Sequence, residues 1–250
     1  MSTSYHSFAQ VYDKFMDNIP YEDWGHYLYG LFQKYSIEEG TLIELGCGTG
    51  TLSLIMAQKG YKIIGIDNSV EMLTIAAAKT AQQSNITLLC QNMQGLELGN
   101  TYDGFYCLCD SLNYLLSEED VLETFKRIKH HLKREGVFIF DLKTPYFYET
   151  VLGDQIFCDH QPDCSYTWEN SYFKEDRINQ YELTFFAKKS DSELFERFTE
   201  IHHQRAFYIS EIIDLLSEAG LEYITAYDAF TDSPPQTDSE RIYIIARNGE

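Results

Sequence analysis

Residues 42 to 50 read Leu42-Ile43-Glu44-Leu45-Gly46-Cys47-Gly48-Thr49-Gly50, an apolar run that ends in three alternating glycines. A second apolar run, Lys62 to Asp67, ends in a carboxylate. Glycine lets the backbone turn sharply and lets a ligand approach it without a Cβ atom in the way. A strand, a glycine turn, a helix and a second strand that ends in an acid are typical of nucleoside-binding α/β folds, in which the acid accepts hydrogen bonds from ribose hydroxyls.

The spacing of the glycines separates the classes of cofactor. A dinucleotide fingerprint, Gly-x-Gly-x-x-Gly, would place its third glycine at position 51, where this chain has Thr51. A phosphate-binding P-loop would need Gly-Lys followed by Ser or Thr, and this chain has Gly50-Thr51-Leu52. Nicotinamide, flavin and P-loop nucleotide binding are therefore disfavoured.

The segment Glu44 to Gly50, together with Gly65-Ile-Asp-Asn-Ser-Val-Glu-Met-Leu73, resembles the class I S-adenosylmethionine (SAM)-dependent methyltransferases. The resemblance continues through most of the chain, and it implies SAM as cofactor and S-adenosylhomocysteine as its product. It also implies that the glycine loop lies against the methionine part of SAM, that the acid after the second strand holds the ribose, and that a following hydrophobe borders the adenine. The residues that would take these roles are Glu44, Gly46, Cys47, Gly48, Gly50, Asp67, Asn68 and Met72. The alternative is a tight turn between strand and helix, with Asp67 only helping to cap the next helix.

Composition narrows the class of protein and of substrate. The chain has 250 residues, 44% of them hydrophobic, which fits one large domain or a domain with an inserted subdomain. Its formal net charge of -20 would repel a phosphate backbone, so we expect a small-molecule substrate and no nucleic acid. No leader-like N-terminus and no apolar run of roughly 20 residues is present, so we expect a cytoplasmic protein with no membrane partner, as a monomer or homodimer. The six cysteines fit free thiols, with those at 47, 90, 107 and 109 buried, and no metal site is expected.

Hydrophobic periodicity predicts the order of the elements. Helices are expected at 5–18, 21–35, 51–59, 69–83 and 118–133, and strands at 41–46, 61–66, 86–91, 102–109 and 136–141. Extended stretches follow at 165–172, 178–188 and 194–204, then a helix capped by Ser210, and strands at 221–228 and 241–247. This order predicts a Rossmann-like, seven-stranded, mostly parallel α/β sheet with helices on both faces, an antiparallel last strand, and a small antiparallel β insert. We divide the chain into 1–149 (N-terminal helices and SAM-binding core), 150–209 (the insert, as a substrate lid) and 210–250 (completion of the core sheet).

Ligands of parallel α/β sheets bind outside the carboxyl ends of the strands. By resemblance, an acid and a hydrophobe after the third strand bracket the adenine, and here that pair is Asn92-Met93, a departure from the usual Asp. The Asn92 amide oxygen can still accept a hydrogen bond, although an Asx turn is the alternative. The segment Cys109 to Tyr114 would lie nearest the methyl group, with Asp110 as a catalytic candidate, or else as the cap of a short turn.

Further candidates come from the two ends of the proposed site. Tyr12, in the first helix, resembles an aromatic residue that many small-molecule methyltransferases place over SAM, although it also fits ordinary helix packing. On the strand 194–204, Glu200, His202 and Gln204 should share one face, and His202 is a catalytic candidate. Asn113, Tyr114, Tyr146 and Arg205 are candidates for substrate binding.

These patterns predict a SAM-dependent methyltransferase that acts on an amine or a hydroxyl of a small molecule. No motif fixes the acceptor or a general base. Two alternatives stay open at this point: a SAM-binding sensor or assembly protein without turnover, and an NAD(P)-dependent reductase that shares the same front half.

Overall fold

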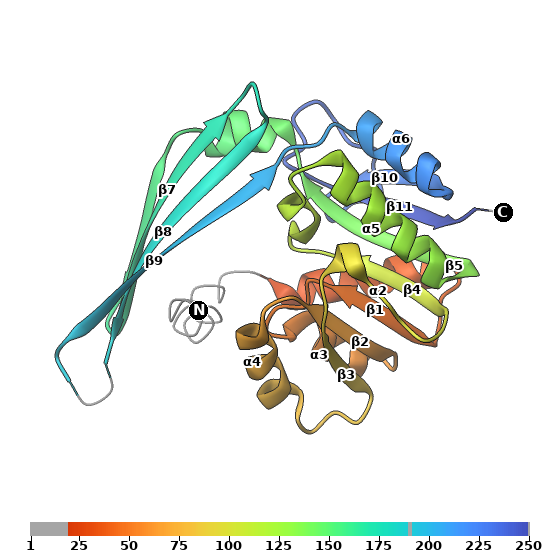
Figure 1. Cartoon of the computed structure of the whole chain (residues 1–250), viewed down its shortest axis with the longest axis horizontal. Coiled ribbons are helices and arrows are strands. Elements are labelled where there is room, and N and C mark those ends of the chain that lie inside the picture. Colours follow the sequence, from red (N-terminus) through yellow and green to blue (C-terminus); the bar gives the residue numbers. More distant parts are fainter. Residues whose placement is uncertain (1–19, 190–191, 250) are drawn as a thin grey trace.

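The computed structural model describes residues 20–189 and 192–249, so the helix expected at 5–18 and Tyr12 lie outside the described residues. The main sheet has seven strands in the order β10-β11-β5-β4-β1-β2-β3 (Figure 1). Their bounds are β1 Thr41–Leu45, β2 Lys62–Asp67, β3 Ile86–Cys90, β4 Tyr102–Cys107, β5 Leu132–Lys143, β10 Leu221–Asp228 and β11 Arg241–Asn248. Strands β1 to β5 are parallel, and β11 runs antiparallel to both of its neighbours, β5 and β10. The predicted fold class, including the antiparallel last strand, is confirmed.

Helices cover both faces of this sheet. They are α2 Tyr21–Lys34, α3 Thr51–Gln58, α4 Val70–Thr80, α5 Glu118–His131 and α6 Ile209–Ala219. On one face, α2 and α3 bury apolar side chains that recur at helical spacing, among them Leu28, Phe32 and Met56. On the other face, α5 and α6 do the same with Phe125 and Leu216. The helices α2, α3, α5 and α6 are therefore held in place by apolar side chains packed on the sheet.

Helix starts follow local capping chemistry, with one correction. The Ser117 hydroxyl accepts from the backbone N–H of Asp120 at 3.1 Å and begins α5, as predicted. Ser210 was predicted to cap α6, but the N-cap is Tyr208, whose N–H donates to the Glu211 carboxylate at 2.8 Å. Because the acidic side chain reaches back to the N-cap amide, the helix starts two residues earlier than the serine rule predicts.

The insert is a separate antiparallel sheet of four strands, β6 Ile156–Gln161, β7 Cys164–Phe173, β8 Ile178–Lys188 and β9 Phe195–Arg205. Figure 1 shows it as a long twisted ribbon beside the core, with β9 leading back to the main fold. A short helix, η3 Phe147–Leu152, precedes it. The sequence predicted three of these strands and missed β6. That strand is at the edge of the sheet and is mostly exposed, so its residues lack the alternation of apolar and polar side chains on which the prediction rests.

The prediction that four of the cysteines are buried is only partly correct. All six are free thiols, and Cys47, Cys107 and Cys164 are buried. Cys90 is exposed because β3 is an edge strand of the main sheet, so one of its sides is not covered. In the described part of the chain, no helix is both long enough and apolar enough to cross a membrane.

Candidate functional site

The glycine loop after β1 adopts a backbone that other residues rarely take. Gly46, Gly48 and Gly50 all have positive φ angles, +70°, +52° and +74°. A Cβ atom built on Gly46 would lie 2.7 Å from the Ser111 hydroxyl, and one built on Gly50 would lie 3.1 Å from the Cβ atom of Ala76. A Cβ atom on Gly48 would meet no atom of residues 20–189 or 192–249 within 4 Å. Packing therefore explains two of the glycines, whereas Gly48, at the carboxyl edge of the sheet, borders space that none of the described residues fills.

Asp67, at the end of β2, is tied to this loop. One carboxylate oxygen accepts from the Gly48 N–H at 2.8 Å, and the other accepts from the Ser69 N–H at 2.9 Å. Ser69 in turn caps α4, since its hydroxyl accepts from the Met72 N–H at 3.2 Å. Both interpretations of Asp67 thus have a basis: it is half-buried beside the loop, and it also organises the start of the helix. Asn68 is exposed next to it.

Glu44 lies beneath the loop rather than at its surface. Its side chain is only 4% exposed and accepts hydrogen bonds from the hydroxyls of Ser53 and Tyr106. Burial raises the pKa of this carboxyl to about 7, against the smaller opposing effect of the two hydroxyl donors. In this conformation Glu44 supports the loop from below. Cys47 is buried as well, and burial raises the pKa of its thiol.

The pair after β3 forms the turn that sequence analysis kept as an alternative. The Asn92 amide oxygen accepts from the Gln94 N–H at 3.1 Å and caps a short helix, η1 Met93–Gly95. Asn92 itself is exposed. The end of the Met93 side chain comes within 4.0 Å of a Cβ atom built on Gly46, so the loops after β1 and β3 meet.

The backbone after β4 is strained. Cys109 and Asp110 have positive φ angles of 60° and 53°, two consecutive non-glycine residues in the left-handed region. Each such residue costs on the order of 1–3 kcal/mol and persists only where surrounding contacts hold it. Here the Asp110 N–H donates to the Asp141 carboxylate at 2.9 Å. Asp110 begins the short helix η2 Ser111–Tyr114, but its side chain does not cap that helix.

Instead, the Asp110 side chain belongs to a buried cluster of four charges. Its two oxygens lie 2.8 Å from the guanidinium of Arg241 and 3.2 Å from the ammonium of Lys143. Arg241 also pairs with Asp141, which is fully buried. These side chains come from the segment after β4, from the end of β5 and from the start of β11, so the cluster joins the carboxyl edge of two parallel strands to the last strand. The four formal charges sum to zero.

Burial and charge act in opposite directions in this cluster. Burial alone would raise the pKa of Asp110, but the charges of Lys143 and Arg241 outweigh it, so its pKa is lowered. Burial lowers the pKa of the Lys143 ammonium more than Asp110 raises it. Burial likewise raises the pKa of Asp141, against the attraction of Arg241.

The insert reaches over this edge of the core. Met72 of α4 packs against Phe185 and Phe198 of the insert. At the near end of β9, the Gln204 amide donates to the Asp110 carboxylate at 2.7 Å. The Gln204 amide oxygen accepts from two buried tyrosines, Tyr148 at 2.8 Å and Tyr181 at 2.6 Å.

The predicted face of β9 is confirmed. Glu200 and Gln204 are buried and His202 is partly buried, whereas Ile201 and His203 are exposed. The His202 imidazole lies 3.1 Å from a Glu200 oxygen, and its ring meets Tyr114 edge-on with centroids 5.9 Å apart. His202 therefore lies between the insert and the segment after β4.

The residues proposed for substrate binding occupy different environments. Asn113 is fully buried. Its side-chain amide donates to the backbone carbonyls of Lys143 and Arg205, and its amide oxygen accepts from the Lys143 N–H. Asn113 therefore connects the insert to the core. The Arg205 guanidinium bonds Glu118 at 2.9 Å and the Leu116 carbonyl at 3.1 Å, at the start of α5. Tyr114 is 46% exposed beside His202, and Tyr146 is half-buried before η3.

Sequence reasoning did not single out Lys143, Arg241 or the bond from Gln204 to Asp110. The strand expected at 136–141 stops before Lys143, and Arg241 was expected only as the start of the strand 241–247. A charged residue that opens an otherwise apolar strand, Arg241-Ile-Tyr-Ile-Ile, was a usable signal. Its partner lies 131 residues away in the sequence and could not be identified without the fold.

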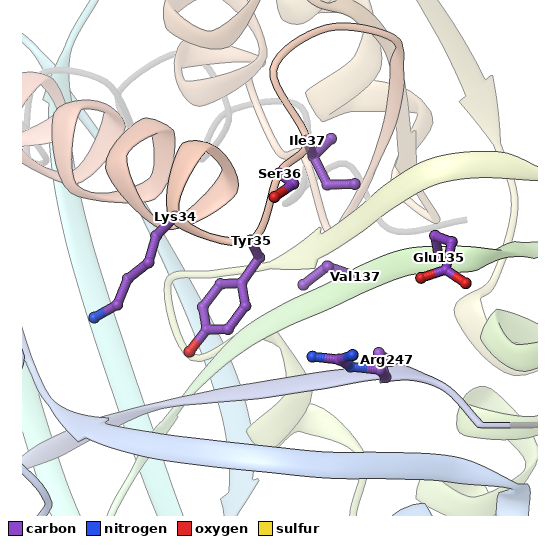
Figure 2. Close-up of a pocket in the computed structure, with 7 residues that line it drawn as sticks. All are labelled: Lys34, Tyr35, Ser36, Ile37, Glu135, Val137 and Arg247. Carbon is purple, nitrogen blue, oxygen red and sulfur yellow. The ribbon is translucent and has the colours of Figure 1, made fainter.

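A cavity of about 300 Å³ lies elsewhere, between the end of α2 and the amino end of β5 (Figure 2). Its lining comprises Lys34, Tyr35, Ser36, Ile37, Glu135, Val137 and Arg247. None of these residues belongs to the loops at the carboxyl ends of the strands. The cavity is therefore separate from the site built by the glycine loop and the charged cluster.

Comparisons with known proteins agree with this geometry. A family model described as "Methyltransferase domain" matches residues 42–136. Two curated proteins named as methyltransferases match nearly the whole chain: one from Geobacillus sp. is 36% identical over 98% of this chain and 99% of its own, and YqeM of Bacillus subtilis is 34% identical over 98% of each. The crystal structure of a SAM-dependent methyltransferase from Clostridium acetobutylicum superposes with a TM-score of 0.87 at 30% identity, covering 98% of this chain and 99% of that one.

These matches decide between the activities left open by the sequence, because they extend over the insert as well as the front half that reductases share. With the strand order and the glycine loop described above, they show that the chain belongs to the class I SAM-dependent methyltransferases.

Proposed function

We propose that this methyltransferase binds SAM along the glycine loop and Asp67, and transfers the methyl group to a small molecule held between the insert and the core. The observation that carries the proposal is the reach of the insert. It contacts the core at Met72 on one side and at Asp110 on the other, and so spans the edge where the predicted cofactor residues lie.

The residues around the loop fit SAM. Gly48 offers a bare backbone that borders open space, which suits close approach of a ligand. Asp67 is half-buried and already positioned by two N–H donors, and a carboxylate so placed can accept from ribose hydroxyls. Met72 and Met93 supply apolar surface for the adenine. Exposed Asn92 would have to turn its amide away from Gln94 to reach the exocyclic amine.

SAM supplies a methyl group on a positively charged sulfur, which leaves as a neutral thioether. The protein's part is therefore to orient the acceptor and to exclude water. The strained Cys109-Asp110 segment, held by Asp141 and Gln204, gives one wall a fixed position. At the moment of transfer an amine acceptor must be neutral, so an amine that binds in its ammonium form first loses a proton to solvent, and a hydroxyl acceptor must likewise be able to lose its proton.

The contacts of the insert and the charge of the protein favour a small acceptor. The insert sheet contacts the core at Met72 and at Asp110, on either side of the predicted cofactor residues, and a net charge of -20 opposes the approach of RNA or DNA. Relatives point in the same direction: a glycine/sarcosine N-methyltransferase of Aphanothece halophytica is 23% identical over 82% of this chain and 75% of its own.

The test is the fate of a labelled methyl group. The protein is incubated with tritiated SAM and, in separate reactions, with a mixture of small amines and alcohols, with total RNA, and with denatured protein. We expect label in the small-molecule reaction, and loss of it in the Gly48→Ala variant. Label that appears only in RNA or protein would overturn the proposal.

A further inference from the structure

One face of the insert sheet is turned towards the core. Strand β9 contacts the core or its loops through Phe198, His202 and Gln204, which are separated by even numbers of residues. Successive residues of a strand point to opposite faces, so these side chains and those paired with them on β8, β7 and β6 share that face. We call it the inner face.

Glu200 lies on the inner face between Phe198 and His202 and is 6% exposed. One of its carboxylate oxygens meets the His202 imidazole at 3.1 Å. The other, Oε1, is buried and has no hydrogen-bond partner among residues 20–189 and 192–249. Leaving a buried charged oxygen without a donor is costly, on the order of 1–3 kcal/mol or more. The vacant acceptor therefore indicates that a donor group from a ligand belongs beside it.

The surroundings of Glu200 suit a cation with an apolar body. Phe198 precedes it by two residues on the same face, and Tyr181 and Phe185 lie diagonally across on β8, within reach of long side chains. Aromatic faces attract ammonium groups, most strongly where water is excluded. These rings and the carboxylate together resemble the two parts of an ammonium-binding site.

The distribution of basic residues points the same way. Strands β6 to β9 contain three Lys or Arg residues, Lys188, Arg197 and Arg205, and the register places all three on the opposite face. Lys143 of the core lies 5.6 Å from the centroid of the Tyr181 ring, and it already pairs with Asp110. Because the charged cluster below is neutral in sum, the negative charge of Glu200 has no counter-ion there.

We propose that Glu200 is the recognition residue for the acceptor, and that the acceptor is an amine whose ammonium form donates to Glu200 Oε1 while its apolar or ring-bearing body lies against Tyr181, Phe185 and Phe198. His202 fixes the other oxygen and is a positioning residue. This assignment rests on the proposed function and narrows its acceptor from an amine or hydroxyl to an amine.

Binding measurements test the assignment without turnover. Calorimetry on protein saturated with S-adenosylhomocysteine compares three pairs that differ in charge: benzylamine with benzyl alcohol, phenethylamine with phenethyl alcohol, and glucosamine with glucose. We expect at least one amine to bind about tenfold or more tightly than its alcohol. This ratio corresponds to the lower end of the range of free energies for a hydrogen bond to a charged group. Glu200→Gln should abolish that preference. Glu182→Gln, the same change on the opposite face of the adjacent strand, should keep it.

Each other outcome has a defined meaning. Equal affinities within all three pairs, or a preference that survives in Glu200→Gln, would overturn the assignment. A parallel loss of SAM affinity in Glu200→Gln would also overturn it, since Glu200 would then serve the sulfonium donor. Failure of the wild-type protein to bind S-adenosylhomocysteine would instead refute the proposed function on which the assignment depends.

Discussion

Gly48→Ala separates ligand binding from folding more cleanly than any other change in the glycine loop. The backbone at Gly48 has a φ of +52°, so a methyl side chain there costs roughly 1–2 kcal/mol of folding free energy. No atom of the described part of the chain lies within 4 Å of the added Cβ, so these residues add no packing penalty. The same atom would stand where SAM approaches the backbone, and we expect the Kd for SAM to rise at least about tenfold, or 1.4 kcal/mol.

Gly60 provides the matched control. It follows α3, has a φ of +105°, and a Cβ atom built on it also meets no atom of the described residues within 4 Å. Urea unfolding should therefore show a loss of stability for both Gly48→Ala and Gly60→Ala, the larger for Gly60, whose φ lies outside the left-handed region that other residues adopt. Calorimetry with SAM should detect weakened binding only in Gly48→Ala. If Gly48→Ala bound SAM within twofold of wild type while folded, the loop would not be the cofactor cradle.

Three further changes test other parts of the structure. In calorimetry, Asp67→Ala should weaken SAM binding by about 1.5–3 kcal/mol, the free energy of a charged hydrogen bond. A loss of only a few tenths of a kcal/mol would mean that Asp67 has a purely structural role. Arg241→Leu leaves the fully buried Asp141 without its partner and should lower the free energy of unfolding in urea by about 3–5 kcal/mol; a loss below about 1 kcal/mol would contradict the cluster. The pKa of Glu44 is raised from 4.5 to about 7, so its contribution to stability is present below about pH 4.5 and is lost as pH rises to about 7. The free energy of unfolding of Glu44→Gln in urea, relative to that of the wild-type protein, should therefore rise by roughly 3 kcal/mol between about pH 4 and pH 8. A difference between the two proteins that does not change with pH would refute this prediction.

The core fold could be predicted from the sequence because each of its elements has a local signature. The glycines at 46, 48 and 50 mark the first turn, and the apolar stripe of α2 or the Ser117 cap of α5 marks a helix. The position of Asp67 at a strand end placed it beside the loop without any knowledge of the structure. Such features depend on spacing within a few residues.

The rest of the candidate site depends on pairings between residues far apart in the sequence. Gln204 meets Asp110 from 94 residues away, and Arg241 meets it from 131. Strand β6 was missed because an exposed edge strand has little periodicity. The role of Asn113 as a clamp between β5 and β9 also follows only from the fold, since the type of residue alone equally suits ligand binding.

A crystal structure of the protein with S-adenosylhomocysteine would test the proposed cofactor site most directly. We predict that the ribose hydroxyls lie within hydrogen-bond distance of the Asp67 carboxylate, that the homocysteine part lies against Gly48, and that the sulfur faces the space between Asp110 and the inner face. A ligand bound away from the glycine loop, or a ribose held by another residue while Asp67 keeps only its two backbone donors, would contradict it.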